Sequence, residues 1–528
     1  MTRMARQDLM AAAATFALLT GGQAPARAPA AAAAQAAPAA QPQAAPRLNV
    51  LFIMADDLAP RTGSYGAAVS TPNLDALARS GVQFEQAYCQ FPWCAPSRAS
   101  MLTGTRPDTT RVMDLNTPFR RALPDIQTLP QYFRNHGYRT TRVGKIFHQG
   151  VPGEIGTGGP DDPQSWDEVA NPRGRDRDAE NGRLKNNSPG VPYGSAMAWL
   201  DDEGADEEQT DGMVATNAIA MLRANAQSGQ PFFLAVGFYR PHVPLVAPKA
   251  YFRPYALEKM KVAAETPESL ARVPDYTKAW NVDNFGMNER QQREIIRAYS
   301  ASTSYMDSQV GRVLKELRAL GLDKNTVIVF ASDHGYLLGE HGQWMKNVLW
   351  NQSTRVPLII SAPGVASAKS ARTVELVDLY PTLTDLAGLP HYSRNEGTSL
   401  VPLLKHPKRA WDRPALSQVR GGRSVTTARW RYTEWEEGKL GVELYDHRSD
   451  PGEHRNLAGL PKYAKVIAQL RAKLPKGPVE KRAPPARYDP VRGCMPGSAS
   501  AAPRPAAPPG AAGGDGPGGL VQCQRLDP

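Results

Sequence analysis

The stretch Leu48-Asn-Val-Leu-Phe-Ile-Met54, followed by Ala55-Asp56-Asp57, decides the fold class of this 528-residue chain. A nearly continuous apolar run of this length is typical of a strand buried on both faces of a parallel sheet. Two adjacent carboxylates follow the run, where open α/β sheets bind their ligands. The stretch therefore predicts a layered α/β protein with a polar site at one edge of its sheet.

Strand-like and helical patterns alternate outward from this stretch, which favours an α/β layered domain. Further strands are predicted at Val82–Tyr88, Tyr138–Val143, Pro231–Phe238, Thr326–Ala331 and Pro357–Ser361. Helices are predicted near residues 71–80, 94–104, 128–136, 211–226, 289–320 and 375–387. Residues 151–208 and 249–287 show no sustained period, and we expect long surface loops there.

The pattern changes after about Arg409. Short strand-like pieces and one helix predict a small antiparallel α+β domain; they lie at residues 423–427, 431–435, 442–445 and 463–474. From Pro475 the chain is rich in Pro, Ala and Gly, which is typical of disorder. We therefore expect a large α/β domain over residues 47–409, a small domain over 410–474 and a disordered tail over 475–528.

The N-terminus has the order of a secretory signal peptide. Arg3 and Arg6 precede an apolar run from Leu9 to Leu19, and small residues follow. The run is too short to span a bilayer, and no other segment has the length of a membrane helix. We expect a signal peptide over residues 1–28, a disordered Ala/Pro linker over 29–46, and export to the periplasm or the medium.

The formal charge of +11 indicates an affinity for anionic partners. The basic residues are spread out and no run of them is interleaved with aromatic residues, so nucleic acid is not the expected partner. An acidic substrate or polymer fits better. The four cysteines, Cys89, Cys94, Cys494 and Cys523, are too few for a disulfide scaffold; the last two can pair within the tail.

The stretch Cys94-Ala-Pro-Ser-Arg98, followed by Met101-Leu-Thr-Gly104, places one thiol at a predicted helix start. Pro suits the first turn of a helix and Gly suits its exit. A group on the Cys94 side chain would lie at the positive helix end, where anions are favoured, and Arg98 adds a planar cation. Two interpretations stay open: a reactive group in an anion pocket, or a structural cysteine bonded to Cys89.

Polar side chains follow four of the predicted strands at the points where they end. They are Asp56 and Asp57, Lys145 and His148, His242, and Asp333 and His334, with Lys346 shortly after. Singly, an Asp after a strand is usually a helix cap and a lone His is usually structural. Because the carboxyl ends of parallel strands meet at one edge, the set together predicts a site. Carboxylate oxygens suit Ca²⁺ or Mg²⁺, with Ca²⁺ preferred where several are available.

The Cys94–Gly104 stretch resembles the signature of the type I sulfatases, in which the cysteine becomes formylglycine (3-oxoalanine). Other stretches resemble the iduronate-2-sulfatase branch in order and spacing: residues 56–58, 106–111, 143–148, 231–244, 304–307, 333–335, 339–342 and 430–432. The resemblance covers about Asn49 to Leu457. It implies an alkaline-phosphatase-like sandwich around a large mixed, mostly parallel sheet, with a small C-terminal α+β antiparallel-sheet domain.

The resemblance implies a metal site and a modified residue. Asp56, Asp57, Asp333 and His334 would hold a Ca²⁺ together with an oxygen of formylglycine at position 94. The implied partners are a sulfated saccharide as substrate and a formylglycine-generating enzyme during maturation. The chain would then be an exported sulfuric ester hydrolase.

The resemblance also implies roles for five cations. Arg98 would steady the formylglycine and the bound sulfate. Lys145 and His148 would contact the hydrated aldehyde, with His148 as a base. His242 and Lys346 would bind the sulfate ester oxygens, and one of them would protonate the leaving alcohol.

Three positions depart from the iduronate-2-sulfatase branch, which has Arg, Lys and Trp where this chain has Thr105, Arg240 and Tyr336. The last two put the sugar contacts in question, so the sequence does not identify the sugar. One alternative function is a phosphonate monoester or phosphodiester hydrolase, since related hydrolases share formylglycine and an Asp/His metal site. Another is a non-catalytic binder of anionic glycans, which predicts an unmodified Cys94.

Overall fold

The computed structural model describes residues 47–180 and 182–494, and all of them belong to one compact unit. The predicted signal peptide, the linker and Cys523 lie outside the described residues. Within the described ranges, none of the helices combines the length and the apolar character needed to cross a membrane.

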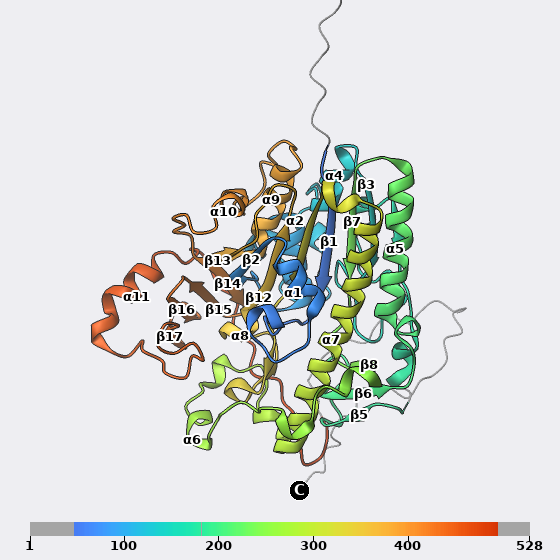
Figure 1. The fold of residues 1–528 in the computed structure, drawn as a ribbon. Coiled ribbons are helices and arrows are strands. Elements are labelled where there is room, and N and C mark those ends of the chain that lie inside the picture. The colour runs from blue at the N-terminus through green and yellow to red at the C-terminus, as the bar shows by residue number, and fades with distance from the viewer. Residues whose placement is uncertain (1–46, 181, 495–528) are drawn as a thin grey trace, which may run out of the picture. The chain divides into compact units, whose positions relative to one another are not determined.

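An eight-stranded sheet, in the order β13-β2-β12-β9-β1-β7-β3-β4, forms the centre of the molecule (Figure 1). Its strands are β1 (Asn49–Ala55), β2 (Val82–Tyr88), β3 (Arg139–Gly144), β4 (Glu168–Ala170), β7 (Phe232–Gly237), β9 (Thr326–Ser332), β12 (Arg355–Ser361) and β13 (Ala368–Glu375). The neighbours β9, β1, β7 and β3 all run parallel, and only β12 runs antiparallel to the strands beside it. The mixed, mostly parallel sheet is therefore confirmed, and four adjacent strands end at one edge.

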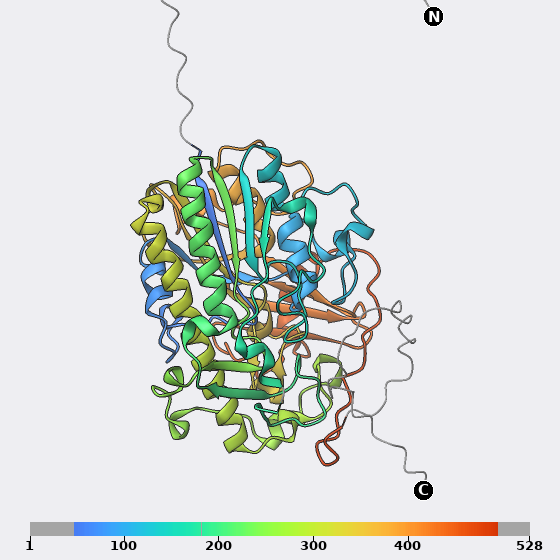
Figure 2. The same cartoon turned by 90° about the vertical axis from the view of Figure 1, so that its right-hand side faces the viewer.

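Alternate residues of β1 pack into two different layers, as its apolar run predicts. Val50, Phe52 and Met54 belong to a core cluster with α2, α4, α9 and α10. Leu51 and Ile53 belong to a second cluster with α1, α5 and α7. Figures 1 and 2 show α5 and α7 side by side over the strands. The helices are α1 (Pro72–Ala78), α2 (Cys94–Thr103), α4 (Leu129–Asn135), α5 (Thr210–Ser228), α7 (Glu289–Ala319), α9 (Leu379–Leu386) and α10 (Val401–Lys405).

A four-stranded antiparallel sheet follows the large one, as predicted. It consists of β14 (Ala415–Val419), β15 (Gly422–Thr426), β16 (Trp430–Trp435) and β17 (Gly441–Asp446), and helix α11 (Ala464–Arg471) packs against it. The edge strand β14 was not predicted. Ser417 of β14 donates to the carbonyl of Cys89 (2.6 Å), and Leu416 N donates to Glu375 (2.8 Å), so hydrogen bonds join the two sheets.

Two segments differ from the sequence-based expectations. Residues 151–208 include β6 (Ala198–Asp202), which is mostly buried and pairs in parallel with β8 (Leu245–Pro248). Residues 475–494 are placed against the main unit, although we expected disorder from Pro475 on. Ala486 N donates to the Ala279 carbonyl (2.8 Å), and the Tyr488 ring is buried. Both differences arise from pairing between segments far apart in the chain, which local composition does not report.

Candidate active site

The carboxyl ends of β1, β3, β7 and β9 bring the predicted polar residues together with the start of α2. Because these strands are parallel neighbours, residues from four distant parts of the chain meet at one sheet edge. The residues that meet there are Asp56, Asp57, Cys94, Arg98, Lys145, His148, His242, Asp333, His334 and Lys346. The predicted set therefore forms one cluster.

Cys94 is the first residue of α2, as predicted. Trp93 before it is extended, Pro96 lies in the first turn, and the helix ends at Gly104 with φ of 67°. The Cys94 Sγ lies 3.3 Å from His334 Nε2. Cys89 and Cys94 both have free thiols, so the alternative interpretation of a disulfide between them is wrong.

Charged neighbours make the Cys94 position favourable for an anion. Burial alone raises the pKa of the Cys94 thiol. Lys145, Lys346 and His334 outweigh burial and hold that pKa well below its ordinary value. The same positive surroundings would stabilise an oxyanion at this point.

Arg98 ties three strand ends to helix α2. The side chain is fully buried, and its Nε donates to Asp333 (2.8 Å) while Nη2 donates to Asp56 (3.1 Å). Its Nη1 donates to the carbonyls of Lys145 (2.7 Å) and Ile146 (2.9 Å). Every guanidinium nitrogen thus has a protein acceptor, so Arg98 holds the site together.

Three buried carboxylates lie close enough to share one cation. Oxygens of Asp56, Asp57 and Asp333 all lie within 4.8 Å of one another. Lys145 Nζ is 2.5 Å from Asp56, and Lys346 Nζ is 2.6 Å from an oxygen of Asp57. Asp57 has a φ of 65°, a left-handed conformation that is uncommon outside glycine and is often found at functional sites.

The pKa values of two of these carboxyls diverge. Burial raises the pKa of Asp333 to about 6, against the lowering effect of Arg98. At Asp56 the Lys145 ammonium outweighs burial and holds the pKa below its usual range. Arg98, Lys145 and Lys346 supply the positive charge that allows these carboxylates to lie close together.

His334 faces the three carboxylates at the end of β9. Its Nδ1 lies 2.9 Å from the Gly335 carbonyl, so Nδ1–H can donate to that carbonyl while Nε2 faces inward. Nε2 is 3.4 Å from Asp57 and 3.5 Å from Asp333. Burial lowers the pKa of His334, but Asp333 and the other nearby negative groups raise it to about 9, so this point favours positive charge. The oxygens of the three carboxylates suit a Ca²⁺ site.

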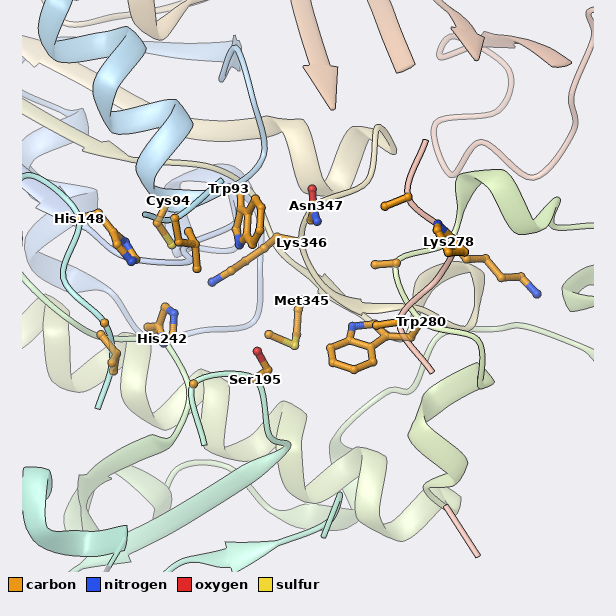
Figure 3. A pocket seen from close by; sticks show the side chains of 18 of the residues that line it. Trp93, Cys94, His148, Ser195, His242, Lys278, Trp280, Met345, Lys346 and Asn347 are labelled. Atoms are coloured by element: carbon orange, nitrogen blue, oxygen red, sulfur yellow. The ribbon is translucent and has the colours of Figure 1, made fainter. Parts of the chain in front are cut away.

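A cavity of about 500 Å³ opens onto this cluster (Figure 3). Cys94, His148, His242 and Lys346 line it, and Figure 3 shows Lys346 extending toward Cys94 and His242. Burial lowers the pKa of His148, and its Nδ1 is buried without a hydrogen-bond partner among the described residues. The buried Lys145, in contrast, does not line the cavity in the described part of the chain.

Two positions expected to affect sugar contacts are not in the cavity lining. Arg240 is buried and donates to the carbonyls of His242 (3.2 Å) and Pro244 (2.7 Å), so it supports the loop that carries His242. Tyr336 is buried with its ring stacked 5.3 Å from that of Tyr299. Neither of these two departures from the iduronate-2-sulfatase branch therefore lies in the described cavity wall.

Sequence reasoning missed several residues that do line the cavity: Trp93, Ser195, Trp280, Asn347 and Arg482. Three of them lie in segments predicted to be surface loops or disordered. Trp93 and Asn347 are direct neighbours of the predicted Cys94 and Lys346, and this proximity was the one available signal.

Comparisons with known proteins agree with this geometry. A family model described as "Sulfatase" matches residues 48–389, and one described as "N-sulphoglucosamine sulphohydrolase, C-terminal" matches residues 339–479. A protein named "Sulfatase" from Formosa agariphila is 35% identical over 81% of this chain and 86% of its own. The iduronate 2-sulfatase of Mus musculus is 34% identical over 80% of this chain and 93% of its own.

Solved structures share the fold. One described as a 2-O GAG sulfatase has a TM-score of 0.62 at 26% identity and covers 81% of this chain and 91% of that chain. The phosphonate monoester hydrolase of Agrobacterium radiobacter has a TM-score of 0.67 at 23% identity, with coverage of 81% and 94%. The expected alkaline-phosphatase-like sandwich with a small C-terminal antiparallel sheet is therefore confirmed.

Proposed function

The chain belongs to the sulfatase family, close to the iduronate 2-sulfatases, and we propose that it hydrolyses a sulfate ester on a sulfated saccharide, using a Ca²⁺ and a formylglycine made from Cys94. One observation carries the proposal. The Cys94 side chain, three buried carboxylates and His334 converge at the inner end of a cavity whose wall adds His148, His242 and Lys346.

The residues of the cluster fit both the proposed Ca²⁺ and the proposed formylglycine. Asp56, Asp57, Asp333 and His334 would hold Ca²⁺, which lowers the pKa of a bound hydroxyl and offsets negative charge. Formylglycine, as its hydrate, supplies one hydroxyl as a nucleophile and a second that allows sulfate to be released.

The cations of the wall fit the charge that develops on a transferring sulfate group. Burial alone would lower the pKa of Lys346, but Asp57 raises it above its usual value, so the ammonium stays charged. Lys346, His242 and the start of α2 can therefore hold ester oxygens. Burial lowers the pKa of His148, which leaves its imidazole neutral near pH 7 and able to accept a proton at position 94. His242 or Lys346 would then protonate the leaving alcohol.

A comparison of two aryl substrates tests the reaction type. We expect kcat/KM for an aryl sulfate to exceed that for the matching aryl phosphodiester by at least about 10-fold, because a difference of about 1.4 kcal/mol in transition-state binding gives that ratio. Faster phosphodiester turnover would instead assign the chain to the phosphonate and phosphodiester hydrolases. No turnover of either ester, together with an unmodified Cys94, would favour a glycan binder.

Removal of Ca²⁺ tests the metal site. A bound Ca²⁺ would contact Asp56, Asp57 and Asp333 together only in the folded protein, so chelation with EGTA should remove activity and lower Tm. A cation at a hundredfold excess over its Kd contributes about 2.7 kcal/mol to folding, which corresponds to a Tm shift of several degrees. Added Ca²⁺ should restore both quantities, and the variant Asp333→Asn should show no such Ca²⁺-dependent shift. An unchanged Tm and unchanged rate in protein shown to be metal-free would contradict the assignment.

Export and maturation complete the proposal. The order of charged, apolar and small residues over positions 1–28 supports export, and these residues lie outside the described ones. A formylglycine-generating enzyme would modify Cys94 during biosynthesis, since the flanking Pro96 and Arg98 match the family signature.

A further inference from the structure

Arg482 brings a cation to the cavity from a part of the chain where we expected disorder. It lines the same cavity as Cys94 and His148, beside Lys278 and Trp280. Figure 3 shows Lys278 and Trp280 on the opposite side of the cavity from Cys94 and His148. The cavity therefore has two basic regions, one at the reacting centre and one at its far end.

The Arg482 guanidinium is held in a fixed position. Its Nε donates to the Tyr276 carbonyl (3.1 Å), and Nη2 donates to the Lys278 carbonyl (2.8 Å). The group also lies 5.1 Å from the centre of the Trp435 ring. Nη1 has no hydrogen-bond acceptor among residues 47–180 and 182–494, so it remains available to a ligand.

The charge of Arg482 is not balanced by the protein. No described carboxylate forms an ion pair with it, whereas the ammonium of Lys278 lies 3.4 Å from Asp275 and 3.7 Å from Asp283. The described lining of the cavity includes no Asp or Glu. Burial lowers the pKa of Arg482 to about 10, as expected for a cation without a counter-charge. Such a cation is destabilising unless a ligand supplies the missing anion.

We propose that Arg482 binds a second anionic group, a carboxylate or a further sulfate, on the same saccharide whose sulfate ester is hydrolysed at Cys94. This inference rests on the proposed function and narrows its substrate to a saccharide with at least two anionic groups. A guanidinium suits both groups, because its planar donors pair with carboxylate and sulfate oxygens.

The space between the two basic regions suits sugar rings. The cavity of about 500 Å³ is within the range of small-molecule sites. Trp93 and Trp280 both line it, and aromatic rings offer apolar surface to the faces of sugars. The fixed guanidinium would then select substrates by the position of their second anion relative to the ester.

Kinetics of Arg482→Met on paired substrates test the inference. The substrates are an aryl sulfate without a second anion, a sulfated disaccharide with a uronate carboxylate, its carboxyl-reduced form, and a disulfated disaccharide without a uronate. We expect kcat/KM to fall roughly 10- to 100-fold, mainly through KM, on the substrate whose second anion binds Arg482, as for a lost charge-assisted hydrogen bond. The aryl sulfate rate should change by less than about twofold. A loss on the uronate disaccharide alone would indicate a carboxylate site, and a loss on the disulfated disaccharide alone would indicate a sulfate site.

Two further variants separate binding from structure. Arg482→Lys keeps the charge and should recover part of the loss. Lys481→Met removes an exposed neighbouring cation and should leave kcat/KM unchanged on all four substrates. An equal loss by Arg482→Met on all substrates, accompanied by a lower Tm, would show that Arg482 only clamps the loop at Tyr276 and would overturn the inference. So would equal kcat/KM of the wild type on the mono-anionic and di-anionic saccharides.

A binding measurement keeps this inference separate from the proposed function. Calorimetry with the desulfated uronate disaccharide and with inorganic sulfate requires no turnover. Weaker binding of either anion by Arg482→Met than by the wild type supports the site even if no sulfate ester is cleaved. Equal binding by the two proteins in both titrations would contradict it.

Discussion

Replacing Cys94 with alanine abolishes sulfate ester hydrolysis, with an expected loss in kcat on the order of 10⁴- to 10⁶-fold, as for removal of a covalent nucleophile in other hydrolases. The reason is chemical, because alanine cannot be converted into an aldehyde, and the nearby Ser97 hydroxyl donates to the Asp333 carbonyl and does not line the described cavity. The loss should be measured with an aryl sulfate under Ca²⁺ saturation. The far-UV spectrum and Tm should remain close to those of the wild type.

Cys89 provides the matched control. It is the other buried free thiol near the site, but burial raises its pKa well above the ordinary value, opposite to the net shift at Cys94. Cys89→Ala should therefore keep most of its activity. Mass spectrometry of the wild-type peptide across Phe91–Arg98 should show that the thiol has lost sulfur and two hydrogens and gained oxygen. Retained activity in Cys94→Ala, or only unmodified thiol in fully active protein, would contradict the proposed nucleophile.

Replacing Arg98 with methionine should both destabilise the protein and remove activity. Methionine is similar in length but leaves Asp56 and Asp333 without the guanidinium that contacts both. Removal of one partner from a buried ion pair typically costs about 3–5 kcal/mol. Denaturant titration should measure that loss, and the aryl sulfate assay should show the loss of a correctly assembled site.

An exposed ion pair of similar length gives the comparison. Arg134 and Asp167 lie 2.6 Å apart, but their side chains are 41% and 34% exposed. Arg134→Met should change the free energy of unfolding by about 0–1 kcal/mol. If both variants lost the same small amount, Lys145 and bound metal would have to neutralise the carboxylates without Arg98, and its clamping role would be wrong.

The position of the site followed from the sequence because it depends on local rules. A strand such as β1, apolar at every position after Asn49, must be buried on both faces, and parallel neighbours must end at the same edge. The residues directly after β1, β3 and β9 therefore converge without any knowledge of packing. The helix start at Cys94 followed in the same way from Pro96 and Gly104.

The far end of the cavity could not be predicted, because it depends on which distant segments pair. Arg482 reaches the site through the contact of residues 475–494 with the loop that carries Trp280, and their Pro- and Ala-rich composition gave no sign of it. Arg240 presents the reverse case. Its departure from the iduronate-2-sulfatase branch put the sugar contacts in question, but its side chain is buried and supports the loop that carries His242.

The burial of Cys94 at the start of α2 limits when this residue can be modified. The side chain is 1% exposed, and it is enclosed partly by His334, which is 240 positions later in the chain. The proposed conversion requires another enzyme to bind the segment around Cys94 while that segment is still accessible. This accessible state ends when β9 joins the sheet and places His334 beside Cys94. At synthesis rates of about 5–20 residues per second, those 240 residues take roughly 12–50 s to appear. The fraction of active protein would thus depend on the rate of modification relative to the rate of folding. Conditions that speed folding would yield more protein that is correctly folded but inactive.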